Sequence, residues 1–206
     1  MNQQSSRTSF KSEKKYFAEV IDSNISGFLA QSWEWNFFPE FGSLVQVENK
    51  KQIILGIVTQ IQTGSMDPMR YPFAYKKTEE ELINEQPQIF EFLKTTFKVQ
   101  ITGYLEENKF FYALPSKPCQ IHAFISKVDP QTEISFLKNP DFMYLLFSFS
   151  NQIDNLDETL IAILNHLKNK NILKSDKISD FCKTFSLLTG NDYRRLKLFL
   201  KRIQNL

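Results

Sequence analysis

A short stretch in which cations alternate with aromatic rings is the first part of this sequence whose residue types could do chemistry. The segment Arg70–Lys77 places one arginine and two lysines beside two tyrosines and a phenylalanine. Aromatic rings stack on bases and cations neutralise phosphates, so this composition suits single-stranded nucleic acid. We favour the alternative of a loop whose aromatic side chains cover one end of the fold. The nucleic-acid candidates in this segment are Arg70, Tyr71, Tyr75, Lys76 and Lys77.

A second basic cluster lies near the end of the sequence. From Leu156 onward there are ten lysines and arginines against five acidic residues. The cations of the last expected helix lie opposite its apolar stripe, and a basic helix that follows a turn could enter a DNA groove. We favour a solvated helix face, because the Gly190-Asn191 break resembles a helix-turn-helix elbow only loosely. The candidates here are Arg194, Arg195, Lys197, Lys201 and Arg202.

Aromatic residues also gather in an expected loop, where two tryptophans are followed by two phenylalanines. Tryptophan is enriched at the energetic centres of protein interfaces, so this loop could anchor a partner. Covering the core is the other interpretation, and both stay open. A lone leucine on the basic face of the last helix is a further contact candidate. We expect association with a partner or with a second copy through Trp33, Trp35, Phe37, Phe38 and Leu198. In that case Trp35→Ala should weaken association more than Lys201→Ala.

Catalytic and metal-binding patterns do not emerge from the sequence. His122 and His166 have no partner at metal-ligand spacing. The two cysteines, Cys119 and Cys182, are too few and too far apart in sequence for a disulfide framework or a metal cluster. This low cysteine content is consistent with a protein that works in a reducing compartment. The acidic run Glu79–Glu81 suits the start of a helix better than acid–base catalysis. We therefore predict no enzymatic activity, no catalytic residue, no metal and no cofactor.

Composition sets broad limits on the protein. The 206 residues are 42% hydrophobic and include 20 phenylalanines, which is enough for one or two domains with real cores. The net charge of +2 implies neither nucleic acid nor an acidic partner. The first 15 residues are rich in Gln, Ser and Lys and read as a flexible tail. The longest apolar run, Phe142–Phe147, is far too short to span a membrane, so we expect a soluble cytoplasmic protein.

Strand patterns dominate the first half of the chain. Strands are predicted near Phe17–Ile21, Gly27–Trp33, Leu44–Val47, Ile53–Ile61, Val99–Tyr104, Phe110–Leu114 and Ile121–Ile125. Gly56 lies inside one of these runs, which is typical of a bulge or a close approach of two backbones. If these strands close into a barrel, we expect Val45, Val47, Ile57 and Ile61 to contribute to its interior.

Helix signals occupy the rest. Residues 66–96 interrupt the strands with an expected helical hairpin, in which Thr78 and Glu81 form a capping box and Pro87 starts the second helix. The segment Lys127–Gln131 is the expected domain boundary. Beyond it, helix starts are predicted at Asp141, at Asn155 with Glu158 as its capping partner, at Ser175 or Asp176, and at Asn191.

The predicted fold class is therefore α+β. We expect a flexible tail over residues 1–15 and a small antiparallel β-barrel over residues 16–126, with a helical insertion at 66–96. A C-terminal α-helical bundle should follow over residues 127–206. Because glycine is scarce in this chain, each one should have a backbone role. The glycines expected to be structural are Gly42, Gly56, Gly103 and Gly190.

The order of these motifs resembles a known family. The segment Phe41–Glu48 is similar to the "Gly-Asp-x-Val-x-Val" start of a strand in the HAS-barrel, and Leu55–Val58 to its "Leu/Ile-Gly-x-Val" strand. Ile101–Tyr104 and the proline pair in Leu114–Pro118 continue the likeness, which covers about Tyr16–Ser126. This barrel is shared by the HerA-type hexameric DNA translocases and the N-terminal domains of rotary ATP synthase subunits. The resemblance implies a small closed barrel that is an accessory to ATP-driven rings.

The insertion from Tyr71 to Phe90 and the segment Gly190–Lys197 resemble uncharacterised HAS-barrel proteins of cyanobacteria and chlamydiae, which implies no activity. HerA relatives continue into an ATPase with Gly-x-x-x-x-Gly-Lys-Ser/Thr, yet this sequence contains no Gly-Lys pair. The function we expect is thus a non-enzymatic adaptor that docks protein partners, with a ring ATPase supplied in trans as one candidate. The alternative is a nucleic-acid-binding protein.

Overall fold

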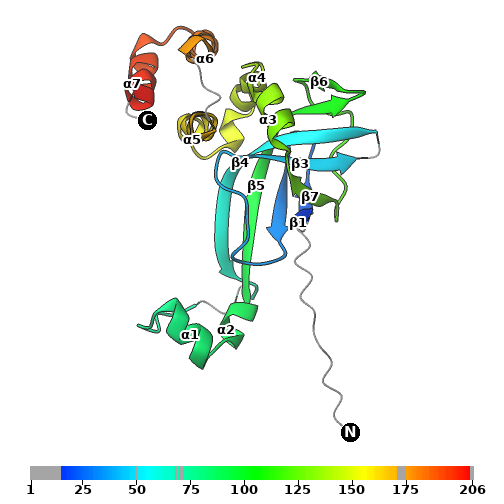
Figure 1. The fold of residues 1–206 in the computed structure, drawn as a ribbon, viewed down its shortest axis with the longest axis vertical. Helices are drawn as coiled ribbons and strands as arrows, with labels where there is room; N and C mark the ends of the chain where they lie inside the picture. The colour runs from blue at the N-terminus through cyan, green and yellow to red at the C-terminus, as the bar shows by residue number, and fades with distance from the viewer. Residues whose placement is uncertain (1–14, 50, 68, 70–71, 171–174, 205–206) are drawn as a thin grey trace.

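The computed structural model describes residues 15–49, 51–67, 69, 72–170 and 175–204 (Figure 1). Its strands are β1 (Tyr16–Ser23), β2 (Gly27–Ser32), β3 (Leu44–Asn49), β4 (Gln52–Ser65), β5 (Leu93–Glu106), β6 (Lys109–Phe111) and β7 (Phe124–Lys127). Its α-helices are α1 (Glu79–Glu85), α2 (Gln88–Glu91), α3 (Pro130–Leu137), α4 (Phe142–Ser148), α5 (Leu156–Asn169), α6 (Ser175–Leu188) and α7 (Tyr193–Gln204). A short 3-10 helix, η1, covers Ser150–Gln152. The flexible tail predicted over residues 1–15 falls almost entirely on residues 1–14, which lie outside the described residues.

Six of the strands close into an antiparallel barrel. The pairings run from β1 to β2, then to β5, β4, β3 and β7, and the pairing of β7 with β1 completes the circle. Closure leaves no strand edge open around the barrel, which removes the usual template for aggregation. The strand β6 stands outside this circle as the second arm of a hairpin with β5. The α+β prediction, with an N-terminal barrel followed by helices, is confirmed.

The two faces of β4 serve two different cores. Ile54 and Val58 point into the barrel, where they pack with Val45 and Val47, as expected for alternating side chains. The prediction that Ile57 faces the interior is wrong. Ile57 is fully buried on the opposite face, beneath the helices. A register shift after Val58 reverses the alternation, so Ile61 packs against the barrel core as predicted.

Glycines allow the closest approaches in the barrel. A Cβ atom on Gly56 would lie 2.4 Å from Val99 Cγ1 and 3.0 Å from the Gln100 carbonyl oxygen. A register shift between Leu55 and Gly56 confirms the expected bulge. Gly42 has φ +79° and meets helix α5, where a Cβ would lie 2.5 Å from Ala162 Cβ. The backbone roles expected for these two glycines therefore follow from their surroundings.

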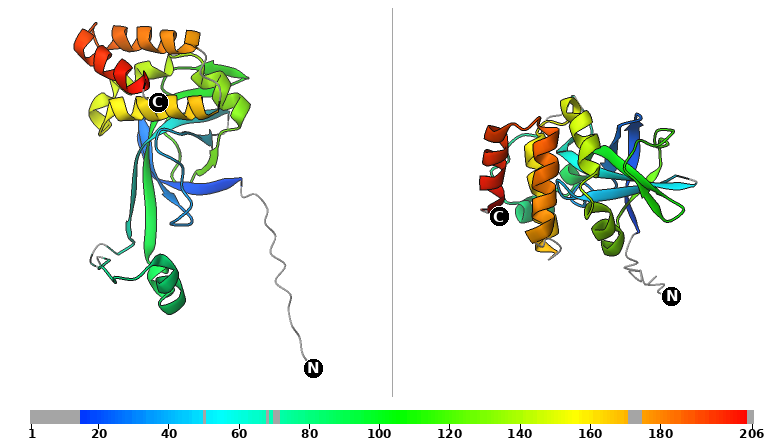
Figure 2. Two further views of the ribbon diagram at one scale, coloured as in Figure 1. Left: turned by 60° about the vertical axis from the view of Figure 1, so that its left-hand side comes forward. Right: turned by 90° about the horizontal axis from the view of Figure 1, so that it is seen from above.

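Phenylalanine side chains join the helices to the barrel and to each other. Leu44, Leu55 and Ile57 of the barrel share one core with the buried rings of α3 and α4. That core continues into α6 and α7, where the Phe185 and Phe199 rings stack at 4.1 Å. Figure 2 shows α5, α6 and α7 gathered at one end of the barrel. Within the described residues, no helix has the length and apolar character needed to cross a membrane.

Helix α3 occupies part of the segment that the sequence analysis treats as a boundary. The Asp129 carboxylate accepts hydrogen bonds from the backbone N–H groups of Gln131 and Thr132, both at 3.1 Å, and Pro130 takes the first helical position. A hydrogen bond from the Thr132 side chain, together with these backbone hydrogen bonds, lowers the pKa of Asp129. The aspartate and proline that suggest a break in the sequence thus start a helix here.

Other expectations shift by a few residues. The last strand runs from Phe124 to Lys127, because His122 adopts φ +68° in a turn just before it. Asp192 rather than Asn191 caps α7, since its side chain accepts a hydrogen bond from the Arg195 N–H at 3.0 Å. Asn191 instead adopts φ +59° in the turn after α6. The start of α5 is confirmed, with Asn155 accepting from the Glu158 N–H at 3.1 Å.

The insertion is carried on a long two-stranded ribbon. Strands β4 and β5 are 14 residues each and extend well beyond the barrel, so residues from Leu93 to Thr96 belong to β5 rather than to the helical hairpin. The predicted capping box of α1 is present, with both the Thr78 and the Glu81 side chains accepting from the other residue's N–H. Figure 1 shows α1 and α2 at the far end of this ribbon, away from α5–α7.

Candidate protein-interaction surface

A cluster of exposed aromatic rings lies on the outer wall of the barrel. Trp33 follows the end of β2 and packs edge-on against Phe124 of β7, with ring centres 5.3 Å apart. The Phe124 ring also lies 5.6 Å from the ring of Tyr16 at the start of β1. Phe37, from the loop after β2, meets the buried ring of Phe17 at 5.9 Å. We name the set Tyr16, Trp33, Phe37 and Phe124 the aromatic patch.

The aromatic patch is rigid but incompletely covered. Trp33 is 46% exposed, Phe37 45% and Phe124 49%. Their backbones are fixed by strand pairing and by the hydrogen bond from Trp33 N–H to the Phe17 carbonyl at 3.0 Å. Exposed aromatic side chains that gather in one place are typical of protein-binding surfaces. This arrangement offers a partner preformed apolar contacts with little further loss of conformational entropy.

Charged groups border the aromatic patch. The Lys127 ammonium lies 5.3 Å from the centre of the Phe37 ring, which is a cation–π geometry. The Lys15 ammonium pairs with Glu48 at 2.7 Å and also lies over the Tyr16 ring. His122 contacts the Glu19 carboxylate on the same side of the barrel. An apolar centre with a polar border is the usual anatomy of a protein interface.

The four aromatic residues predicted as contacts do not all belong to this surface. Trp35 turns toward the insertion, where it stacks on Phe90 at 5.4 Å, and its carbonyl oxygen accepts a hydrogen bond from Thr95. Phe38 is exposed but lines a separate hollow with Glu40 and His166. Trp33 and Phe37 come together as expected. The sequence analysis missed Tyr16 and Phe124, although strand alternation around the buried Ile125 could have placed Phe124 outside.

The basic face of α7 is partly neutralised. Arg195 binds the Asp157 carboxylate with two hydrogen bonds, of 2.6 and 3.2 Å, and its guanidinium lies over two phenylalanine rings. Arg202 pairs with Glu158 at 2.6 Å, and this hydrogen bond lowers the pKa of Glu158. Three of the five predicted cations are exposed beside Leu198 and form no ion pair with a described residue, namely Arg194, Lys197 and Lys201.

The other nucleic-acid candidates lie elsewhere. Arg70 and Tyr71 are outside the described residues. Tyr75 packs on Phe73 with ring centres 4.5 Å apart, Lys77 pairs with Glu85, and Lys76 is exposed. These residues adjoin α1, which Figure 1 places at the opposite end of the molecule from α7. The structure therefore does not bring the two predicted basic sets onto one surface.

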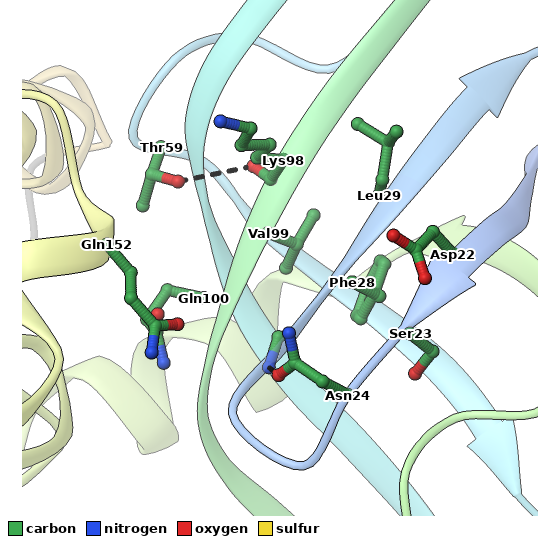
Figure 3. Close-up of a pocket in the computed structure, with 11 residues that line it drawn as sticks. Asp22, Ser23, Asn24, Phe28, Leu29, Thr59, Lys98, Val99, Gln100 and Gln152 are labelled. Carbon is green, nitrogen blue, oxygen red and sulfur yellow. Dashed lines mark hydrogen bonds between the residues drawn. The ribbon is translucent and has the colours of Figure 1, made fainter.

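A polar pocket of about 170 Å³ lies between the β1–β2 turn and β5 (Figure 3). Three of its polar side chains, Asn24, Gln100 and Gln152, bind the neighbouring residue Ser26. Asn24 Oδ1 accepts from the backbone N–H groups of Ser26 and Gly27, and the Ser26 hydroxyl lies 3.0 Å from the Gln152 amide oxygen. Gln100 Nε2 donates to the Ser26 carbonyl at 2.6 Å. This network joins the barrel to η1.

Reactive side chains are poorly placed for catalysis. Burial raises the pKa of the Cys119 thiol to about 12, and burial also raises the pKa of Cys182. A thiol held in its neutral form is a weak nucleophile. His166 is occupied by the Phe41 carbonyl at 3.0 Å and by Glu40 at 3.5 Å. In the part of the chain that is described, no three His, Cys, Asp or Glu side chains gather as metal ligands would.

Comparison with known proteins identifies the barrel. The search of curated proteins gives no match, so the narrower likeness to the cyanobacterial and chlamydial group stays a prediction. A family model described as the HAS barrel domain matches residues 18–107. That span holds strands β1 to β5 together with the insertion, while the closing strand β7 follows it. The matched sequence, and the closed six-stranded barrel to which it contributes, identify residues 18–107 of this chain as a HAS barrel domain.

Proposed function

We propose that this protein is a non-enzymatic adaptor that docks protein partners through its HAS-type barrel, with a ring ATPase supplied in trans as a candidate partner. HAS barrel domains typically mediate protein interactions or accompany ATPases. The observation that carries the proposal is the aromatic patch. Its exposed rings are held in place by two barrel strands, β1 and β7, and by the loop after β2, and no described segment of the chain covers them.

The absence of catalytic function is part of the same proposal. The sequence holds no Gly-Lys pair, so it cannot build the phosphate-binding loop of HerA-type ATPases. Purified protein should therefore turn over no ATP above a buffer control. Steady turnover that a single substitution within this chain abolishes would contradict the proposal.

Affinity capture from native extract tests the docking surface. The double variant Trp33→Ser/Phe124→Ser removes the centre of the aromatic patch without emptying the barrel interior. It should lose most of the partner that wild-type protein retains, because truncated aromatic anchors each weaken binding by about tenfold or more. The matched control is Leu187→Ser, since Leu187 is an exposed apolar side chain on α6. Equal capture by all three proteins would show that the aromatic patch is not the docking surface.

The nucleic-acid alternative receives less support from the structure. Two of the five candidate cations on α7 are paired with α5, and the other basic segment lies at the far end of the molecule. A face with three cations that form no ion pair with a described residue predicts at most a shallow dependence of affinity on salt, with a slope of about −3 in logarithmic terms. Tight binding to DNA or RNA at low salt, lost on reversing Arg194, Lys197 and Lys201, would restore this alternative.

A further inference from the structure

The insertion contains an apolar hollow that the rest of the described chain leaves open. Its volume is about 650 Å³, and its lining comes from the end of the β4–β5 ribbon, the loop before α1, and both insertion helices. Two of its lining residues are unusually exposed, since Met69 is 89% and Phe73 70% exposed. The other apolar contributors include Tyr75, Leu82, Ile89 and Phe92. We name this hollow the insertion cup.

The segment that forms the insertion cup carries more acidic than basic residues. The segment from residue 66 to 94 has six acidic and four basic residues. Glu81 is engaged in the capping box and Glu85 pairs with Lys77. Glu79, Glu80 and Glu91 are exposed and form no ion pair with any described residue. Lys76 is exposed in the same segment, so the region around the apolar floor keeps an excess of negative charge rather than negative charge alone.

The opposite end of the molecule presents the complementary pattern. Leu198 is 59% exposed on the outward face of α7. The opposite face of the helix is apolar and buried, with Phe199 in the core. Arg194 lies one helical turn before Leu198, and Lys197 and Lys201 flank it. These three cations form no ion pair with a described residue, in contrast to Arg195 and Arg202. The result is an exposed apolar side chain within a positive face.

We propose that α7 of one copy docks in the insertion cup of a second copy. The apolar stripe of α7 is buried in its own core, so Leu198 is the apolar side chain that would enter the groove. Helices that place apolar side chains in a groove are a common mode of protein recognition, and complementary charge fixes their orientation. Figures 1 and 2 place α1 and α2, which line the cup, at the opposite end of the molecule from α7, so one copy cannot fill its own cup with its own α7. Because the two surfaces differ, the contact is head-to-tail. The proposal involves none of the aromatic patch and stands apart from the adaptor function.

Light scattering and sedimentation velocity at low salt, on protein treated with nuclease, test the association. Wild-type protein should increase in average mass with concentration and dissociate at high salt, because exposed ion pairs are screened. The cup variant Phe73→Ser/Glu79→Lys/Glu80→Lys and the helix variant Arg194→Glu/Lys197→Glu/Leu198→Ser should each be monomeric. Circular dichroism and thermal melting establish that both variants are folded. The matched controls are Leu187→Ser and Trp33→Ser/Phe124→Ser, which should associate as wild type does.

Mixing the two variants gives the sharpest result. The cup variant keeps an intact α7 and the helix variant keeps an intact cup, so together they should form a one-to-one dimer although neither associates alone. A wild-type protein that stays monomeric at the highest concentration overturns the proposal. Association that survives in both variants, or a mixture that stays monomeric, overturns it as well. Loss of self-association only in the aromatic-patch variant would assign the contact to that patch instead.

Discussion

At the residue scale, Gly56 stands at a close approach of two barrel strands. A side chain there would meet Val99 and the Gln100 carbonyl, so Gly56→Val should lower the free energy of unfolding by about 1–3 kcal/mol. Gly64 is the matched control, because it lies in the same strand with no atom within 4 Å of its expected Cβ. Gly64→Val should be close to neutral in urea denaturation. Equal losses in the two variants would remove the argument for a tight contact at Gly56.

Cys119 offers a second test at this scale. Burial raises the pKa of its thiol to about 12, whereas the unfolded chain should titrate near the ordinary value of about 8.5. Between these values the unfolded state loses its proton first, so stability decreases as pH rises. From about pH 8 to pH 10, wild-type protein should lose about 1–2 kcal/mol more than Cys119→Ala in urea denaturation. Parallel curves of unfolding free energy against pH for the two proteins would show that the thiol ionises as easily in the folded state as in the unfolded state.

At the element scale, Gly42 controls how closely the barrel and α5 approach. Gly42 and Gly190 have φ of +79° and +65°, so alanine at either position adds backbone strain of about 1–2 kcal/mol. Only Gly42 also meets a neighbour, Ala162 of α5, whereas Gly190 faces open space. Gly42→Ala should therefore lower the melting temperature more than Gly190→Ala does. The reverse order would indicate that α5 is not seated against this loop.

The elements also show what local sequence can predict. The capping box at Thr78 and the barrel strands follow from signals within a few residues, and these expectations are confirmed. Helix α3 is missed because an aspartate followed by a proline is typical both of a loop between domains and of a helix start. Ile57 is assigned to the wrong face because both faces of β4 are buried, which hides the alternation. Only the pairing of β4 with its neighbours and the helices above it distinguishes the two faces.

At the scale of the whole molecule, distant pairings decide which surface residues are available. Arg195 and Arg202 look equivalent to Arg194 in the sequence, yet they pair with Asp157 and Glu158, which lie on α5, 38 and 44 positions away. Trp35 looks equivalent to Trp33, yet it stacks on Phe90 of the insertion. The aromatic patch likewise combines strands from both ends of the barrel sequence. Such arrangements depend on the tertiary fold, so motif spacing alone does not predict them.

The central claim is that the aromatic patch contacts a protein partner. Site-specific photo-crosslinking in native extract tests it most directly, with a photoreactive phenylalanine analogue placed at Phe124 and, as the control, at Leu187. Both positions are exposed in the folded chain, at 49% for Phe124 and 62% for Leu187, so both probes are accessible to a partner. The account predicts a discrete crosslinked adduct from position 124 that is absent from position 187. The same adducts from both positions, or none from position 124, would contradict it.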